Sequence, residues 1–178
     1  ADPYGGFWIG TMGLAAEPHA GSIYRFFEGE IVKLFPNITI SNSICFSPDK
    51  KFGYFCDTPE RKIMRVSLDQ KGWPSSDPEV FIDLQETNLN PDGAVIDLSG
   101  YLWSAQWGAS RVARYDRNGC YVSELKFNAK QISCPAFGGK NMSTLFATSA
   151  SVDLDDASPN DGKTFLTEVD SVGQEEHR

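Results

Sequence analysis

Short apolar runs, rather than helical stripes, make up most of this chain. Four of these runs share an aromatic position: GGFWIGT at 5–11, FGYFCDT at 52–58, GYLWSAQ at 100–106 and STLFATS at 143–149. Runs that are rich in aromatic and β-branched residues and bounded by Gly, Pro, Asp or Asn are typical of β-strands joined by turns. The pattern therefore predicts an all-β chain with very little helix.

The runs recur at a nearly constant interval. Aligning Trp8, Phe55, Trp103 and Phe146 gives steps of 47, 48 and 43 residues. A second family of segments follows the first three runs, and a third family precedes three of the four, so each unit holds about four strands. A period of about 45 residues with four strands is typical of a β-propeller blade. A β-sandwich with chance similarity is the alternative, and the three aligned families favour the propeller.

The repeat also predicts which side chains meet at the propeller axis. Chain reversals rich in Ser, Pro, Asp, Gly and Asn are expected at 47–50, 98–100 and 138–141. Asn42, Asp92 and Cys134 each lie five residues before an equivalent turn position. The strand that precedes such a turn lines the central channel of a propeller. We therefore expect Asn42 and Asp92 to converge at one mouth of that channel.

Two such oxygen-bearing side chains suit a particular kind of ion. Amide and carboxylate oxygens are hard ligands, which suit calcium, magnesium, manganese and, less exclusively, zinc. A divalent ion there could polarise a carbonyl group and lower the pKa of bound water, and an adjacent carboxylate could act as a general base. The alternative is that Asn42 and Asp92 only cap turns.

Composition and charge narrow the class of protein. The 178 residues are enough for one domain, 1–178, and carry a net charge of −8. The closing segment 151–178 holds six of these net charges, and an acidic chain is unsuited to a phosphate backbone, so no nucleic-acid partner is expected. No apolar stretch approaches the roughly 20 residues that span a bilayer, so no membrane partner is expected either.

Cysteine spacing and the acidic loop carry two smaller predictions. The four cysteines lie among apolar neighbours and have no CxxC spacing. No secretory signal is visible at the start of the chain. We therefore expect reduced, mostly buried thiols in a cytoplasmic protein. The stretch DLDDASPNDG at 153–162 lacks the EF-hand spacing, so a solvated acidic loop is expected there.

The chain resembles the SMP-30/gluconolactonase/luciferin-regenerating family of regucalcin-like proteins. The matching segments are DPYGGFWIGTMG (2–13), AGSIYRF (20–26), ISNSICFSPD (40–49), YFCDT (54–58), NPDGAVIDLSGYLWSAQWGASRVARYD (90–116) and SCPAFGGKNMSTLFATSA (133–150). The Pro-Asp-Gly element, followed by Leu-Trp, Trp-Gly and Arg-Val, is the most specific of these. The resemblance covers nearly all of 2–150, and the closing 162–178 is similar to the end of bacterial members.

This resemblance implies a six-bladed β-propeller with one divalent metal in the central channel, which could be Ca, Zn, Mg or Mn. It also implies a hydrolase that opens sugar lactones. The family holds its metal with a Glu from the first blade, an Asn that maps to Asn42 and an Asp that maps to Asp92. The resemblance further implies that Asp92 is catalytic and assists the attack of water on the lactone carbonyl.

The chain departs from the family in length. Six blades need roughly 300 residues, and this chain supplies about three and a half blades. The family's metal-binding Glu, and an Asn-Asp pair that contacts substrate, would precede the segment DPYGGFW. The chain could be the C-terminal portion of a longer product, could pair with a second chain that completes the propeller, or could be an inactive truncated homologue. A non-catalytic calcium-binding or scaffold propeller is the rival function.

Four further residues have candidate roles near the site. Trp107 is expected to line the substrate pocket, with packing between blades as the alternative. Asp57 is the lesser substrate-binding candidate, because an acid at a strand end often binds local backbone amides. Cys134 is expected to pack at the channel mouth and is a poor ligand for a hard metal. Ser43 stands where many family members have glycine, and it leaves the Asn42 oxygen available.

Overall fold

The chain folds into four antiparallel sheets. The structure, a computed structural model, describes residues 1–175 and 177. In this part of the chain there are fourteen strands, and one 3-10 turn, η1 (Thr58–Glu60), is the only helical element. At four strands per blade, fourteen strands amount to three and a half blades. The all-β prediction and the predicted number of blades are both confirmed.

The sheets follow one another along the sequence. The first sheet contains β1 (Phe7–Gly10), β2 (Gly21–Phe27) and β3 (Glu30–Ile38). The second contains β4 (Ser41–Phe46), β5 (Phe52–Asp57), β6 (Lys62–Ser67) and β7 (Glu79–Asp83). The third contains β8 (Asn90–Ile96), β9 (Leu102–Trp107), β10 (Arg111–Tyr115) and β11 (Tyr121–Lys126). The fourth contains β12 (Gln131–Gly138), β13 (Thr144–Ala150) and β14 (Thr164–Glu168).

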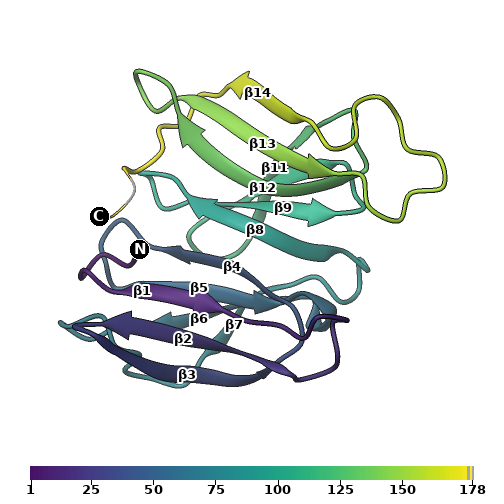
Figure 1. The fold of residues 1–178 in the computed structure, drawn as a ribbon. Coiled ribbons are helices and arrows are strands. Elements are labelled where there is room, and N and C mark those ends of the chain that lie inside the picture. The colour runs from purple at the N-terminus through teal and green to yellow at the C-terminus, as the bar shows by residue number, and fades with distance from the viewer. Residues whose placement is uncertain (176, 178) are drawn as a thin grey trace.

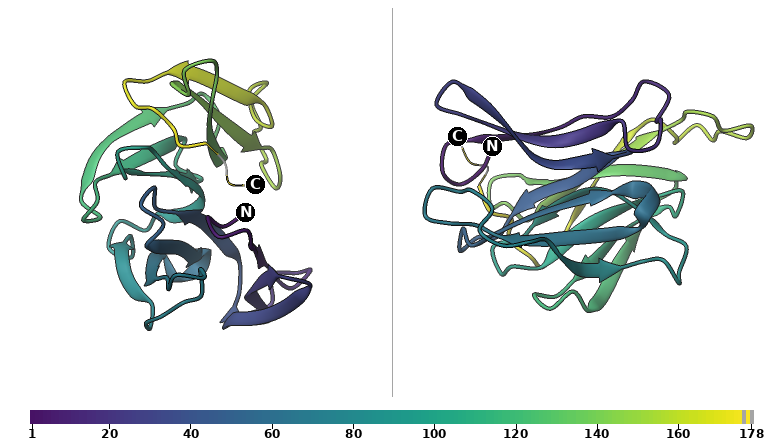
Figure 2. Two further views of the ribbon diagram at one scale, coloured as in Figure 1. Left: turned by 90° about the vertical axis from the view of Figure 1, so that its left-hand side faces the viewer. Right: turned by 90° about the horizontal axis from the view of Figure 1, so that it is seen from below.

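The four sheets fan about a common axis, as the blades of a propeller do (Figures 1 and 2). Strands β4, β8 and β12 lie innermost, and β8 contacts both β4 and β12. The view along the axis shows an open arc of four sheets rather than a closed ring (Figure 2, left). All three predicted turns join an innermost strand to the next strand of its sheet.

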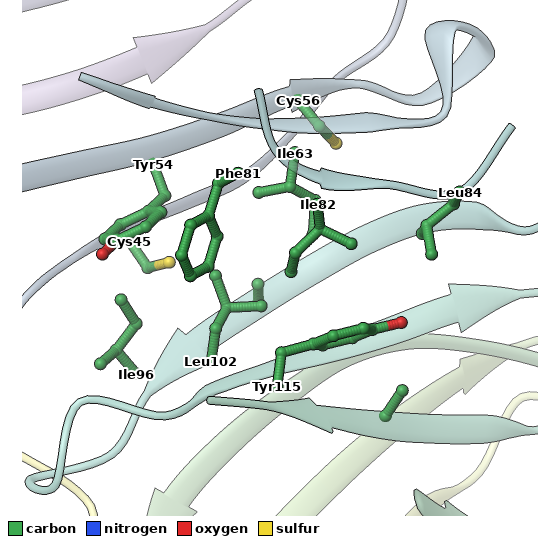
Figure 3. Close-up of a cluster of buried hydrophobic side chains, with 12 residues drawn as sticks. Cys45, Tyr54, Cys56, Ile63, Phe81, Ile82, Leu84, Ile96, Leu102 and Tyr115 are labelled. Atoms are coloured by element: carbon green, nitrogen blue, oxygen red, sulfur yellow. The ribbon is translucent and has the colours of Figure 1, made fainter. Parts of the chain in front are cut away.

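Apolar side chains fill the space between neighbouring sheets. The cluster between the first and second sheets includes Trp8, Ile23, Phe46, Phe55 and Val66. The cluster between the second and third sheets joins residues such as Tyr54, Ile63 and Ile82 to Ile96, Leu102 and Tyr115 (Figure 3). The cluster between the third and fourth sheets includes Trp103, Val112, Ile132 and Leu145. Because successive residues of a strand point to opposite faces, each inner sheet buries both of its faces.

In the second sheet, the residue aligned with Trp103 was predicted as Phe55, which is one position too far along the chain. Tyr54 pairs with Cys45 and faces the third sheet, just as Trp103 pairs with Val95 and faces the fourth. Phe55 faces the opposite way, toward the first sheet. Tyr54, and not Phe55, is therefore the structural equivalent of Trp103.

The cause of this shift is the length of the turn. The turn after β4 closes with a hydrogen bond from Ser47 N to Phe52 O, whereas the turn after β8 closes from Asp97 N to Tyr101 O. The first turn is one residue longer, so the strand that follows is displaced by one position. The difference in turn length does not affect the alignment of Asn42 with Asp92, because each of these residues lies before the turn of its own sheet, five residues ahead of Ser47 and Asp97 respectively.

The cysteines differ from one another in burial. The prediction of mostly buried thiols is right for Cys45 and Cys56, which are buried, and wrong for Cys120 and Cys134, which are exposed. Within the described residues, no helix is long and apolar enough to cross a membrane.

Candidate functional site

Each innermost strand carries a one-residue bulge near the same mouth of the channel. The pairing shifts between Asn42 and Cys45 in β4, between Pro91 and Ala94 in β8, and between Ile132 and Cys134 in β12. A bulge leaves backbone groups outside the ladder and changes the direction of nearby side chains. The three residues predicted to face the channel mouth therefore lie at or beside the irregular part of their strands.

The side chain of Asn42 is half-buried and has a defined neighbour. Its Nδ2 atom donates a hydrogen bond to Oγ1 of Thr58, at 3.0 Å. Thr58 follows β5 directly and begins η1. No hydrogen bond to Oδ1 of Asn42 is found within the described residues. The amide is thus oriented with its nitrogen toward Thr58 and its oxygen left for another partner.

Asp92 is half-buried as well, and its carboxyl group lacks a cationic neighbour in the described part of the chain. Burial raises its pKa to about 6, and the only opposing effect is a hydrogen bond from the backbone N–H of Gly93. Removal of water from a carboxylate without a compensating positive charge is unfavourable. A cation bound beside Asp92 would remove this penalty.

Hydrogen bonds between the second and third sheets hold the two strands together at this point. The hydroxyl of Ser43 donates to the backbone carbonyl of Asp92 at 2.5 Å, and the hydroxyl of Thr58 donates to the carbonyl of Pro91 at 2.7 Å. The buried thiol of Cys56 contacts Ser43 Oγ at 3.4 Å. The bulge in β8 exposes these two carbonyls to the neighbouring sheet. The strands that carry Asn42 and Asp92 are therefore joined directly beside both residues.

Ser43 adopts a backbone conformation that favours glycine. Its φ angle is +56°, in the left-handed region, where a side chain costs about 1 kcal/mol or more. A glycine would adopt this conformation without that cost. Here the serine hydroxyl offsets part of that strain through its hydrogen bond to Asp92.

The two side chains fit part of the ligand shell of a hard divalent ion. Calcium takes six to eight oxygen ligands, and Asn42 and Asp92 offer an amide oxygen and a carboxylate. No group of three or more His, Cys, Asp or Glu side chains that could hold a metal is found among the described residues. The remaining ligands of such an ion would therefore be water or groups outside this part of the chain.

The acidic loop has a different role from an ion site. The Asp161 carboxylate accepts hydrogen bonds from the backbone N–H groups of Lys130 and Ser158, and Asp156 pairs with the exposed side chain of Lys130. These contacts hold the loop against the start of β12. Most of the loop is exposed, which agrees with the prediction of a solvated acidic loop.

The side chain of Asp57 binds the backbone that leads into β4. Its side chain is buried, and its two oxygens accept hydrogen bonds from the backbone N–H groups of Thr39 (2.9 Å) and Ile40 (2.8 Å). These bonds fix the entry of the chain into β4. These contacts favour the alternative expected for Asp57, the binding of local backbone amides, and its role in binding substrate stays a prediction.

Trp107 and Cys134 lie near Asp92. Trp107 ends β9 and pairs with Asn90, so it lies at the same end of the third sheet, and its role in a pocket stays a prediction. A Cβ atom added to Gly93 would lie 2.7 Å from Sγ of Cys134. The thiol therefore packs closely against the residue after Asp92, which agrees with the packing role expected for Cys134.

Sequence reasoning missed Thr58. The segment CDTPE offered one signal, because a proline early in a helical turn ends the preceding strand and reverses the chain. That reversal brings the Thr58 hydroxyl back toward β4. Nothing in the pattern indicated that this hydroxyl would reach the next sheet.

Comparison with known proteins relates this arrangement to one family. Residues 1–151 match the family described as the SMP-30/Gluconolactonase/LRE-like region. A protein of Rhizobium meliloti (strain 1021), whose name gives sugar lactone lactonase as a provisional activity, is 44% identical over 177 residues, which is 97% of this chain and 60% of the relative. The L-arabinolactonase of Azospirillum brasilense is 34% identical, over 97% of this chain and 59% of its own length.

A solved structure is similar over the same extent. The crystal structure of a calcium-binding protein, regucalcin, from Agrobacterium tumefaciens str. C58 superposes with a TM-score of 0.94 at 45% sequence identity. It covers 97% of this chain and 60% of its own. The chain thus spans about three fifths of the length of these relatives.

The strained serine gives a first prediction. Ser43→Ala keeps the left-handed backbone strain and leaves the Asp92 carbonyl without its donor, so the free energy of unfolding falls by about 1–3 kcal/mol. Ser43→Gly loses the same hydrogen bond but relieves the strain, so its loss is smaller by about 1 kcal/mol. Urea unfolding with a chelator present measures both values. A glycine variant less stable than the alanine variant would contradict this account.

A second prediction follows from the pKa of Asp92 in metal-free protein. The folded-state pKa of about 6 exceeds the usual 3.8, so between these values the folded state binds more protons than the unfolded state and stability falls as pH rises. Partial exposure limits this loss to about 1–3 kcal/mol. Asp92→Asn should lack it, so in EDTA the variant gains stability over the wild type between pH 4 and pH 7. Parallel stability curves for the two proteins would refute the desolvation of Asp92.

Proposed function

Because this chain belongs to the SMP-30/gluconolactonase/LRE-like family, we propose that the protein hydrolyses sugar lactones with the help of a divalent metal ion. The observation that carries the proposal is the junction of β4 and β8, where Ser43 and Thr58 hold the strands of Asn42 and Asp92 together. The names of the lactonase relatives support the reaction class. The calcium-binding relative supports the kind of ion.

Each of the two residues has a distinct role in this proposal. Oδ1 of Asn42 binds the ion, since Nδ2 is occupied by Thr58. The carboxylate of Asp92 is both an ion ligand and the group that accepts a proton from the attacking water. A divalent ion held there would supply Lewis-acid chemistry, the polarisation of a lactone carbonyl and the stabilisation of developing negative charge. Trp107 is proposed to form one wall of the pocket from the end of β9.

The open ends of the arc suggest how the ring is completed. On the free face of the first sheet, Phe7, Phe26 and Ile31 lie side by side and are 51%, 43% and 64% exposed. On the free face of the fourth sheet, Phe146 lies beside Leu166, which is 67% exposed. Exposed apolar sheet faces of this kind call for a covering partner.

We propose that further blades of the same polypeptide cover both faces. Three and a half blades correspond to about 60% of the relatives' length, so a complete ring of this type holds about six blades. A second copy would bring four more sheets into a gap for about two and a half blades. The additional blades would also supply the ligands that complete the shell around Asn42 and Asp92.

The mass of the expressed polypeptide tests this completion. The 178 residues weigh 19.7 kDa, and at 60% of the full length the complete product should weigh about 33 kDa. Mass spectrometry of the protein purified from its native source measures the value directly. A native product of 19.7 kDa would rule out completion in cis.

Lactone hydrolysis itself is tested with the full polypeptide and a panel of aldonolactones. Asp92→Ala should lower kcat by about 10²- to 10⁴-fold or more, because an ion ligand and the proton acceptor are lost together. EDTA should abolish turnover and added divalent metal should restore it. Asp77→Asn, at an exposed acid in the loop between β6 and β7, is the matched control and should leave turnover unchanged.

The same assay separates the proposal from its rival. Turnover that survives both EDTA and Asp92→Ala would contradict the proposed chemistry. Binding of calcium without hydrolysis of any lactone would instead favour a calcium-binding or scaffold propeller.

A further inference from the structure

The hydroxyl of Thr58 lies between the proposed metal ligand Asn42 and the third sheet. Its backbone N–H donates to the carbonyl of Ile40 at 3.0 Å, which fixes the residue against the start of β4. Its Oγ1 atom receives the Asn42 Nδ2 hydrogen bond and donates to the Pro91 carbonyl. Thr58 therefore contacts the side chain of one candidate ligand and the residue before the other.

The direction of these hydrogen bonds follows from a count of protons. A threonine hydroxyl carries one proton, and a backbone carbonyl can only accept. The 2.7 Å contact with the Pro91 carbonyl therefore uses the single proton of Thr58. Oγ1 is left with lone pairs alone, so it can face only the donor end of the Asn42 amide, which is Nδ2. The carbonyl of Pro91 thus determines which end of Asn42 turns toward Thr58.

The orientation of this amide decides whether Asn42 can bind a cation. A rotation of 180° about the last side-chain bond exchanges the oxygen and the NH₂ group with almost no change in shape. Only the oxygen can be a metal ligand, since an NH₂ group would present its protons to the ion. An asparagine without an orienting neighbour would hold the wrong end toward the ion for part of the time.

We propose that Thr58 is a positioning residue that orients the Asn42 amide so that Oδ1 faces the channel and the ion. This inference rests on the proposed metal binding by Asn42 and Asp92. Thr58 does not touch the ion in this account. It acts through Asn42, and the Pro91 carbonyl on β8 makes that action dependent on contact between the second and third sheets.

A matched pair of variants tests the role of the hydroxyl. Thr58→Val keeps the shape and removes the hydroxyl, whereas Thr58→Ser keeps the hydroxyl. Mn²⁺ alone is the probe, and its affinity for the full polypeptide is measured by electron paramagnetic resonance. Thr58→Val should weaken Mn²⁺ binding by about 10- to 100-fold, the usual effect of losing a group that orients a ligand. Thr58→Ser should bind Mn²⁺ as the wild type does.

A second background separates orientation from general folding effects. In Asn42→Asp the side chain presents an oxygen at either end, so orientation no longer matters. If Thr58 acts by orienting the amide, Thr58→Val should cause no loss of Mn²⁺ affinity in the Asn42→Asp protein. A loss of the same size in both backgrounds would overturn the proposal, because it would assign the effect of Thr58 to folding.

The remaining outcomes also decide the matter. Wild-type protein that binds no Mn²⁺ would overturn the proposed metal chemistry and this inference together, whereas normal Mn²⁺ binding by Thr58→Val would overturn this inference alone. Hydrogen exchange of the wild-type Asn42 side chain gives an independent reading if Thr58→Val does not fold. One Nδ2 proton should exchange slowly with solvent, and rapid exchange of both would contradict the hydrogen bond to Thr58.

Discussion

The candidate site of this protein depends on the contact between the inner strands of its second and third sheets. Two hydroxyl groups of the second sheet, from Ser43 and Thr58, donate to two successive carbonyls of β8. Both bonds are short, at 2.5 Å and 2.7 Å. Ser43 and the neighbouring Cys56 are buried, and burial raises the pKa of the Cys56 thiol to about 12. The two hydrogen bonds hold the strands of Asn42 and Asp92 in a fixed relation. Without that contact, the two proposed ligands, which lie on separate sheets, would not be held in place for one ion.

The propeller supplies this contact through packing on a larger scale. Apolar clusters between neighbouring sheets set the spacing of the blades, and the cluster around Tyr54, Ile63 and Leu102 aligns the second sheet with the third (Figure 3). The bulges then turn a few residues of each inner strand out of the regular ladder. Regular packing thus positions the blades, and irregular backbone at their inner edge presents the polar groups. This division is common where a rigid scaffold carries a reactive site.

Most of the fold could be predicted from the sequence, because every blade repeats the same pattern of apolar runs and turn residues. Apolar residues that alternate at period two, followed by turn residues at regular intervals, are enough to predict sheets of about four strands. The alignment of Phe55 failed because pairing depends on the number of residues in a turn, which composition does not reveal. The Asp57 carboxylate and the Thr58 hydroxyl differ in role although they are adjacent, since one points to the backbone before β4 and the other to β8. Contacts between sheets of this kind depend on the three-dimensional packing and could not be read from local pattern.

The most direct test of the central claim is a crystal structure of the full polypeptide soaked with Mn²⁺ and recorded at a wavelength that gives anomalous signal. The account predicts a single peak in the channel within about 2.0–2.6 Å of both Oδ1 of Asn42 and a carboxylate oxygen of Asp92. An ion that contacts one of these side chains and not the other, or that lies elsewhere in the molecule, would contradict it.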